Sequence, residues 1–270
     1  MKKLLALVCV LLFGASAAMA ETSIRVDGST TVLPAMQKIV EAYMKANPGV
    51  NITVSGGGSG NGIKAIIDGS TNVAMSSREM KPKEFDAAKE KGHAVKPIEI
   101  AMDALAPIVN PANPVANLTT EQLQGIYSGK IKNWKDVGGE DKEIVVISRD
   151  TSSGTYEAWQ ELVMKDQKVA PSALLQASSG AVLQVVGKNK YAIAYDGYAY
   201  VNNTVKALTV NGVAGNEKSV ADKSYPVSRA LFIIVPEALD APVQKFVDFI
   251  MDAANGQKII KEVGYFPVKK

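Results

Sequence analysis

Short apolar runs that are typical of buried strands alternate with helical patterns along most of this chain. The runs lie at residues 24–26, 52–54, 73–75, 105–109, 144–147, 192–195 and 231–235. Parallel strands have to be joined by a crossover, most often a helix, so this alternation predicts repeated βαβ units. We expect an α/β protein with parallel-type sheets and flanking helices.

Two of the helices are marked clearly by their apolar spacing. Residues 36–44 carry apolar side chains at i, i+3, i+4, i+7 and i+8, and Asn47-Pro48-Gly49 ends the pattern. The same spacing recurs over residues 243–251 and is closed by Asn255-Gly256. Because these apolar faces carry no reactive groups, we interpret them as packing surfaces.

Two turn-rich segments interrupt the alternation. Asn110-Pro111-Ala112-Asn113-Pro114 follows one expected strand, and Tyr225-Pro226-Val227-Ser228 precedes another. We interpret them as two chain crossings between lobes, although turn residues are also common within single domains. On this interpretation residues 21–104 and 229–270 form a first, discontinuous lobe, and residues 105–228 form the second. A ligand would lie between the two lobes.

The first 20 residues are typical of a secretory signal peptide. They contain Lys2 and Lys3, an apolar run over residues 4–13 and the small-x-small pattern Ala18-Met19-Ala20. The run is too short to span a bilayer, and Cys9 lacks the small preceding residue that a lipid-attachment site needs. We expect a mature chain of 270 − 20 = 250 residues that is periplasmic and not lipidated.

Charge and metal-ligand content exclude several classes of protein. Without the signal peptide, 30 − 2 = 28 basic residues face 27 acidic ones, which indicates neither a nucleic-acid partner nor an anionic membrane. Cys9 is the single cysteine, and the single histidine, His93, follows Lys91-Gly92 in what reads as an exposed turn. We therefore expect no disulfide, metal or cofactor. Without coiled-coil heptads or a long exposed apolar stretch, a monomer is expected.

One segment combines several groups that bind oxyanions. Residues 149–155, Arg-Asp-Thr-Ser-Ser-Gly-Thr, come directly before a helical pattern. A helix start has unpaired N–H groups and partial positive charge, and an arginine adds a planar fork of donors that suits phosphate or carboxylate. The alternative is that Arg149 forms a salt bridge, for which Asp150 is the nearest partner.

Other segments repeat this arrangement after expected strands. They are Gly28-Ser29-Thr30-Thr31, the glycine-rich run 56–62 around Ser59, and Ser76-Ser77-Arg78. In an open α/β sheet, ligands bind beyond the carboxyl ends of the strands, where helices begin. Taken alone, any one serine or threonine is more often a helix N-cap than a ligand contact, and Arg78 could belong to a solvated helix face. Several such segments together favour one anion pocket.

The residues give little support for catalysis. The glycine-rich run matches neither a Walker A loop nor a dinucleotide fingerprint, and the sequence has no G-x-S-x-G elbow and no calcium loop. Ser59 and Ser153 lack a nearby base or metal ligands that would activate them as nucleophiles. We therefore expect binding without turnover, and not an enzyme.

The sequence resembles the periplasmic phosphate-binding proteins of bacterial high-affinity phosphate ABC transporters, in their shorter form. The resemblance spans essentially the whole mature chain and includes residues 28–34, 58–60, Arg149 with 153–155, and Gly264-Tyr265-Phe266-Pro267. It implies a two-lobed, hinge-closing periplasmic binding protein fold, type II-like, with two crossings. The phosphate contacts that it implies by position are Thr30, Thr31, Ser59, Arg149, Ser153, Gly154 and Thr155.

The sequence departs from the family's longer form at one functional position. Members of that form place an aspartate after the third strand, where it accepts the proton of hydrogen phosphate and helps to reject sulfate. This chain has Ser77 there, followed by Arg78. A hydroxyl can accept the same bond but does not repel sulfate as a carboxylate does. Our hypothesis is that Ser77 accepts the phosphate proton and that Arg78 supplies a second positive charge.

The resemblance implies a receptor that captures inorganic phosphate and delivers it to an inner-membrane ABC permease with its ATPase subunits. Two alternatives stay open. One is a binding protein for another oxyanion, such as sulfate, molybdate or a phosphonate, which the serine at position 77 leaves open. The other is a secreted phosphate-ester hydrolase. The sequence also leaves a role as adhesin or signalling partner open.

Overall fold

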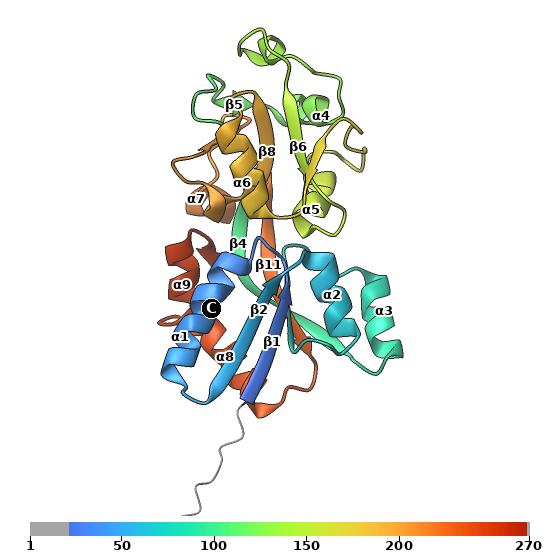
Figure 1. Cartoon of the computed structure of the whole chain (residues 1–270), viewed down its shortest axis with the longest axis vertical. Coiled ribbons are helices and arrows are strands. Elements are labelled where there is room, and N and C mark those ends of the chain that lie inside the picture. The colour runs from blue at the N-terminus through green and yellow to red at the C-terminus, as the bar shows by residue number, and fades with distance from the viewer. Residues whose placement is uncertain (1–21, 269–270) are drawn as a thin grey trace, which may run out of the picture.

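The computed structural model of this protein describes residues 22–268, so the expected signal peptide and Cys9 lie outside the described residues. The described chain forms two lobes stacked along the long axis of the molecule (Figure 1). The helices and strands of the lower lobe are β1 (Thr22–Gly28), α1 (Leu33–Ala46), β2 (Val50–Gly56), α2 (Ser59–Ile67), β3 (Val73–Ser76), α3 (Pro82–Glu90), α8 (Ala241–Met251), α9 (Gly256–Val263) and β12 (Phe266–Pro267). Those of the upper lobe are β5 (Asn117–Leu118), α4 (Thr120–Tyr127), β6 (Val145–Arg149), α5 (Gly154–Leu162), β7 (Leu174–Gln176), α6 (Ser179–Lys188), β8 (Ala192–Gly197), β9 (Lys206–Ala207), β10 (Thr209–Val210) and α7 (Glu217–Ala221).

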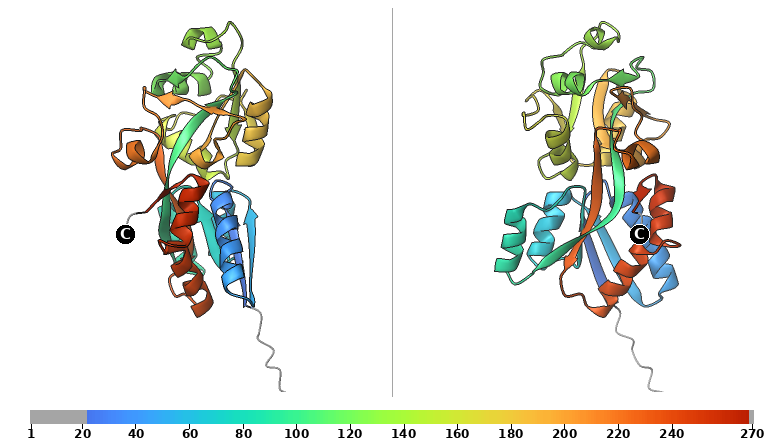
Figure 2. Two further views of the ribbon diagram at one scale, coloured as in Figure 1. Left: turned by 90° about the vertical axis from the view of Figure 1, so that its left-hand side faces the viewer. Right: turned by 180° about the vertical axis from the view of Figure 1, so that it is seen from behind.

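Two long strands, β4 (Val95–Val109) and β11 (Ser228–Pro236), run from one lobe into the other (Figure 2). They are antiparallel partners, with Arg229 opposite Asp103 near the crossing. Beyond this point, residues 105–109 of β4 pair with β8 of the upper lobe. The chain therefore crosses within β4 itself. The proline-rich segment 110–114 follows the end of β4 in the upper lobe, so our interpretation of it as a crossing is wrong.

Most strands join in one curled sheet in the order β2-β1-β3-β11-β4-β8-β6-β7, with β9 and β12 also pairing with β4, while β5 and β10 form a separate two-stranded sheet. Pairing is parallel among β2, β1 and β3 and among β8, β6 and β7, as the βαβ pattern predicts. The centre is antiparallel, because β11 runs against both β3 and β4, and β4 runs against β8. Each predicted apolar run falls in or overlaps a strand, and the α/β fold with flanking helices is confirmed.

Each lobe has its own apolar core. In the lower lobe, the predicted face of α1 packs with Phe246 and Ile250 of α8 against β1 and β3. In the upper lobe, the rings of Trp159 and Tyr195 stack with centroids 4.3 Å apart. α8 already ends at Met251 with Asp252 as its C-cap, so the prediction that Asn255-Gly256 closes it is wrong. Asn255-Gly256 instead begins a further helix, α9, which the sequence pattern did not predict. No helix in the described range is long and apolar enough to cross a membrane.

Candidate functional site

The first turns of α1 and α2 in the lower lobe face those of α5 and α6 in the upper lobe. Contacts between the lobes close the space between them. The Gly60 N–H donates to Ser152 O over 2.9 Å, and the hydroxyl oxygens of Thr31 and Thr155 lie 2.8 Å apart. The segments that the sequence singled out therefore meet at one place, where helix starts supply N–H groups and partial positive charge.

Thr30 and Thr31 lie on the turn between β1 and α1. Ser29 Oγ accepts from the N–H groups of Thr31 and Val32, at 3.2 and 3.4 Å, so Ser29 caps the turn. Gly28 has a φ of 136°, and a Cβ there would collide with the carbonyl oxygen of Met75. Both threonine side chains are almost fully buried and are in contact with Arg149 and Thr155 of the upper lobe.

Ser59 and Ser77 form the part of the site that the lower lobe contributes below α5. Ser77 N–H donates to Ser59 Oγ over 3.0 Å, and the two hydroxyl oxygens are 3.2 Å apart. Gly154 at the start of α5 lies against this pair, because a Cβ there would meet Ser59 Oγ and would be 2.8 Å from Ser77 Oγ. Glycine is therefore required for α5 to approach the lower lobe.

Ser153 and Thr155 flank this glycine, and both are buried. Ser153 is the N-cap of α5, and its Oγ accepts from Tyr156 N–H over 3.3 Å. The N-cap alternative is thus correct for Ser153, but capping uses only a lone pair and leaves the hydroxyl proton available.

Arg149 is 1% exposed and ends β6 beside the cluster. Its Nε donates to Gln176 O at 3.0 Å, while its terminal nitrogens lie 3.2 Å from Ser179 Oγ and 3.1 Å from Thr30 Oγ1. Burial lowers the pKa of Arg149, although a guanidinium stays charged at any physiological pH. Asp150 is not its partner, since that carboxylate accepts from Ser152 N–H at 2.8 Å.

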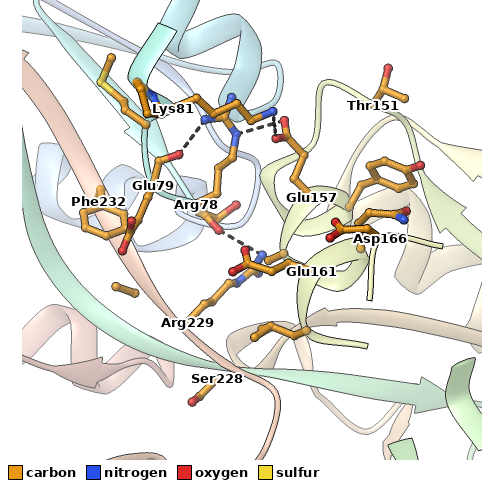
Figure 3. Close-up of a pocket in the computed structure, with 18 residues that line it drawn as sticks. Arg78, Glu79, Lys81, Thr151, Glu157, Glu161, Asp166, Ser228, Arg229 and Phe232 are labelled. Carbon is orange, nitrogen blue, oxygen red and sulfur yellow. Dashed lines mark hydrogen bonds and ion pairs between the residues drawn. The ribbon is translucent and has the colours of Figure 1, made fainter. Parts of the chain in front are cut away.

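The structure does not bring Arg78 into this cluster. Its NH2 lies 2.8 Å from Glu84 Oε1 of α3, and its Nε lies 3.0 Å from Glu157 Oε1 of α5, without hydrogen-bond geometry in the latter case. Lys81 also pairs with Glu157. Arg78, Lys81 and Glu157 line an open pocket of about 870 Å³ next to the cluster (Figure 3). Arg78 and Lys81 therefore join the two lobes through Glu157.

Sequence reasoning missed Ser179 and Asp196, both fully buried beside Arg149. Ser179 Oγ donates to Asp196 Oδ1 over 2.8 Å, and Gly197 N–H donates to the same oxygen over 2.8 Å. Burial raises the pKa of Asp196 to about 6, and the positive charge of Arg149 opposes that rise. The repeat of Ser-Ser-Gly at 152–154 and 178–180 was a signal that could have pointed to Ser179.

A second buried ion pair supports the cluster from the crossing strands. The Nε and NH2 of Arg229 lie 3.1 and 3.0 Å from Asp103 Oδ2, and NH1 donates to Ser77 O over 3.3 Å. The pair thus fixes the backbone of Ser77 relative to β4 and β11.

The chemistry of the cluster is that of hydrogen bonding to an anion. Within residues 22–268 no group of histidine, cysteine, aspartate and glutamate side chains could hold a metal ion. His93 is exposed and bonds through Nδ1 to Ile67 O at 2.8 Å, at the far end of α2 from Ser59. The site is buried between two lobes and consists of hydroxyls, N–H groups and one guanidinium. Such a site is that of a solute-binding protein for a small oxyanion.

Comparisons with known proteins agree with this class. The model of the PBP superfamily domain matches residues 15–254. The phosphate-binding protein PstS of Borreliella burgdorferi is 30% identical over 92% of this chain and 91% of its own length. This chain belongs to the PBP superfamily and, within it, to the family of phosphate-binding proteins.

Solved structures show the same relationship. A putative phosphate ABC transporter substrate-binding protein with bound phosphate, from Clostridium perfringens, is 38% identical. The match covers 92% of this chain and 100% of that one, with a TM-score of 0.86. An ABC-type phosphate transport receptor from Vibrio cholerae is 34% identical over 91% of this chain and 100% of its own, with a TM-score of 0.74.

Proposed function

We propose that this protein captures inorganic phosphate in the cleft between its lobes and delivers it to the permease of an ABC transporter. The observation that carries the proposal is the buried cluster to which both lobes contribute, with Arg149 bonded to Thr30 across the cleft. Members of the family to which the chain belongs are named for phosphate binding, and one is solved with bound phosphate.

The proposed phosphate ligands are the residues that the structure brings together. They are Thr30, Thr31, Ser59, Ser77, Arg149, Ser153, Gly154 and Thr155. We assign Arg78 to closure of the lobes instead, because two glutamates occupy its guanidinium. The proposed lobes are residues 21–104 with 229–270, and residues 105–228. Contacts from both lobes form only in the closed state, so the ligand favours closure.

We propose that this protein binds phosphate without turnover and is not an enzyme. In the described part of the chain, the site hydroxyls have no histidine beside them, and the buried Asp196 is bonded to Ser179 and Gly197. A secreted phosphate-ester hydrolase would need a base or a metal to activate Ser59 or Ser153. The absence of nitrophenol release from nitrophenyl phosphate is the expected result.

The remaining parts of the proposal concern place and partners. We propose a monomer in the periplasm, secreted through a signal peptide, residues 1–20, that is cleaved off and not lipidated. It docks on an inner-membrane permease served by ATPase subunits. Export is the role that the signal-peptide pattern of those residues indicates.

The test is calorimetric titration of the mature protein, unfolded and refolded to remove carried-over phosphate. We expect micromolar or tighter binding of phosphate, with sulfate and molybdate much weaker. Equal binding of sulfate would favour a receptor for another oxyanion. Binding of none of the three anions would reject the transport proposal.

A further inference from the structure

The directions of the hydrogen bonds in the site determine whether it can distinguish phosphate from other oxyanions. Hydrogen phosphate and sulfate have the same size and charge near neutral pH, but only hydrogen phosphate carries a proton that it can donate. A site made only of donors binds both ions alike. Discrimination needs an oxygen that can only accept, because its lone pairs repel every oxygen of sulfate.

Most hydroxyls of the cluster are free to donate to an anion. Thr30 Oγ1 accepts from Arg149 NH2 and, at 3.4 Å, from Ser179 N–H. Ser59 Oγ accepts from Ser77 N–H, and Ser153 Oγ accepts from Tyr156 N–H. Thr30 Oγ1 thus has both lone pairs engaged by the protein, while Ser59 Oγ and Ser153 Oγ each have one engaged. Among the described residues no carboxylate holds the protons of these hydroxyls, so they can donate to the ligand.

The hydroxyl of Ser77, which the sequence suggests as the proton acceptor, has no fixed hydrogen-bond direction. Among the described residues its hydroxyl meets only Ser59 Oγ, at 3.2 Å, and either oxygen can donate in that pair. A hydroxyl that can rotate to donate to sulfate as readily as it accepts from hydrogen phosphate does not separate the two ions.

Ser179 is the hydroxyl whose proton is committed to a carboxylate. It donates to Asp196 Oδ1, which is itself fixed by Gly197 N–H, so the Ser179 oxygen can turn only lone pairs toward the cluster. One lone pair accepts from Arg149 NH1 over 3.2 Å, and the oxygen lies 3.5 Å from Thr30 Oγ1, so the remaining lone pair is held beside two proposed phosphate ligands. In the described structure, Asp196 Oδ2 is buried without any partner. Burying a carboxylate oxygen without a hydrogen-bond partner costs free energy. The presence of Asp196 beside the site therefore indicates a functional role there.

We propose that Ser179 accepts the proton of hydrogen phosphate, and that Asp196 is the positioning residue that makes Ser179 an acceptor by holding its proton. The proposal rests on the proposed function of the site and moves the specificity role from Ser77 to a residue of the upper lobe. No proton is transferred, because the ligand and the serine each keep their own.

The experiment measures phosphate affinity by calorimetry and the concentration of sulfate that displaces phosphate, in the mature protein and its variants. Ser179→Ala and Asp196→Ala should each lower the preference for phosphate over sulfate by roughly tenfold or more, the effect of removing one partner of a buried hydrogen bond. Asp196→Asn should retain more of the preference than Asp196→Ala, because the amide oxygen can still accept from Ser179 and Gly197. Ser77→Ala should weaken both anions without changing their ratio.

Ser178→Ala is the matched control. Ser178 caps the same helix, α6, through Ala181 N–H at 3.2 Å but has no bond to Arg149, Thr30 or Asp196. Its loss should lower the midpoint of thermal unfolding slightly and leave the anion preference unchanged. Thermal unfolding of every variant confirms that it is folded. If Asp196→Ala does not fold, the comparison of Ser179→Ala with Ser178→Ala decides.

A folded Ser179→Ala protein with the original preference would overturn the inference, and so would loss of preference in Ser77→Ala alone. Both outcomes leave phosphate binding by the unmodified protein intact, so they are separate from failure of the proposed function. That failure would appear as an unmodified protein that does not bind phosphate.

Discussion

At the residue scale, the site depends on the buried guanidinium of Arg149, which has no direct carboxylate partner among residues 22–268. The donors of Arg149 are taken up by backbone carbonyls and by the hydroxyls of Thr30 and Ser179, while Asp196 lies one hydrogen bond further away. A positive charge held in this way attracts an anion more strongly than one already neutralised at contact distance.

Removing this charge should abolish most of the binding. Arg149→Ala is expected to cost roughly 2–5 kcal/mol of phosphate binding free energy, the range for loss of one partner of a buried charge pair. Calorimetry measures the loss, and Arg25→Ala provides the control, since the Arg25 side chain is 62% exposed and lies 4.0 Å from its partner Asp27. A loss within the error of the titration would place Arg149 outside the site.

Asp196 should leave a signature in the pH dependence of stability. Burial raises its pKa from 3.8 to about 6, while Arg149 and Arg229 counteract the rise. Between about pH 4 and pH 6 the folded protein therefore holds a proton that the unfolded chain releases, so the contribution of this group to the free energy of unfolding falls as pH rises.

Asp196→Asn removes this dependence. Without ligand, the unfolding free energy of the variant minus that of the unmodified protein should increase by roughly 1–3 kcal/mol from pH 4 to pH 7. Urea unfolding at both pH values measures the gain. The same difference at pH 4 and pH 7 would show that Asp196 titrates normally.

The limits of sequence reasoning are also visible at this scale. Thr30, Ser59, Arg149 and Ser153 stand in motifs that end at a helix start, so local pattern was sufficient to single them out. Asp196 lies near the end of β8 without any such motif, and its closeness to Arg149 comes from the pairing of β6 with β8, a contact between distant segments. The ion pairs of Arg78 likewise depend on how α5 approaches α3 across the cleft.

At the scale of elements, glycines set the distances at which helix starts meet strands. Gly62 in α2 lies so close to β1 that a Cβ would be 2.6 Å from Gly28 Cα and 2.7 Å from Asp27 O. This contact holds the first turn of α2, and with it Ser59, against the carboxyl end of β1. The sequence pattern singled out the glycine-rich run, but α2 begins inside it at Ser59, and a packing distance has no local signature.

Gly62→Ala should therefore destabilise the protein by about 1–3 kcal/mol, the usual effect of overpacking. The matched variant is Gly180→Ala in α6, where a Cβ meets nothing within 4 Å. It should change stability by less than about 1 kcal/mol, in the stabilising direction, because alanine favours a helix over glycine. Urea unfolding compares the two. Similar stabilities for both variants would contradict close packing at Gly62.

The antiparallel centre of the sheet was not predicted, for a reason that belongs to this scale. Alternating strands and helices indicate parallel pairs, and the outer strands obey that rule. β11 follows a turn near the end of the upper lobe and returns between β3 and β4, and a sequence pattern does not reveal such an insertion.

At the scale of the whole molecule, closure is supported by charges outside the anion cluster. Glu157 of α5 pairs with both Arg78 and Lys81 of the other lobe, and the Arg78 and Glu157 side chains are only 8% and 21% exposed. Because these ion pairs join the two lobes, we expect them to break when the lobes separate and thus to stabilise the closed state without touching the ligand.

Glu157→Gln should consequently speed up phosphate release. We expect a rise in the dissociation rate of roughly three- to tenfold, equivalent to about 1 kcal/mol for the lost ion pairs. Stopped-flow measurement of release tests this. Asp141→Asn is the control, because Asp141 pairs with Lys135 within one lobe and both side chains are exposed. Unchanged release from Glu157→Gln would show that these ion pairs do not hold the lobes closed.

The path of β11 also fixes the order in which the chain can complete its structure. β11 lies between β3 and β4, so the sheet of the lower lobe has a gap until residues 228–236 are present. The strands β6, β7 and β8 of the upper lobe come earlier in the chain and need only the end of β4 as a neighbour. The lower lobe, which contains β1, is therefore the last to be finished, and a chain cut short before β11 would carry a formed upper lobe beside an unclosed lower one.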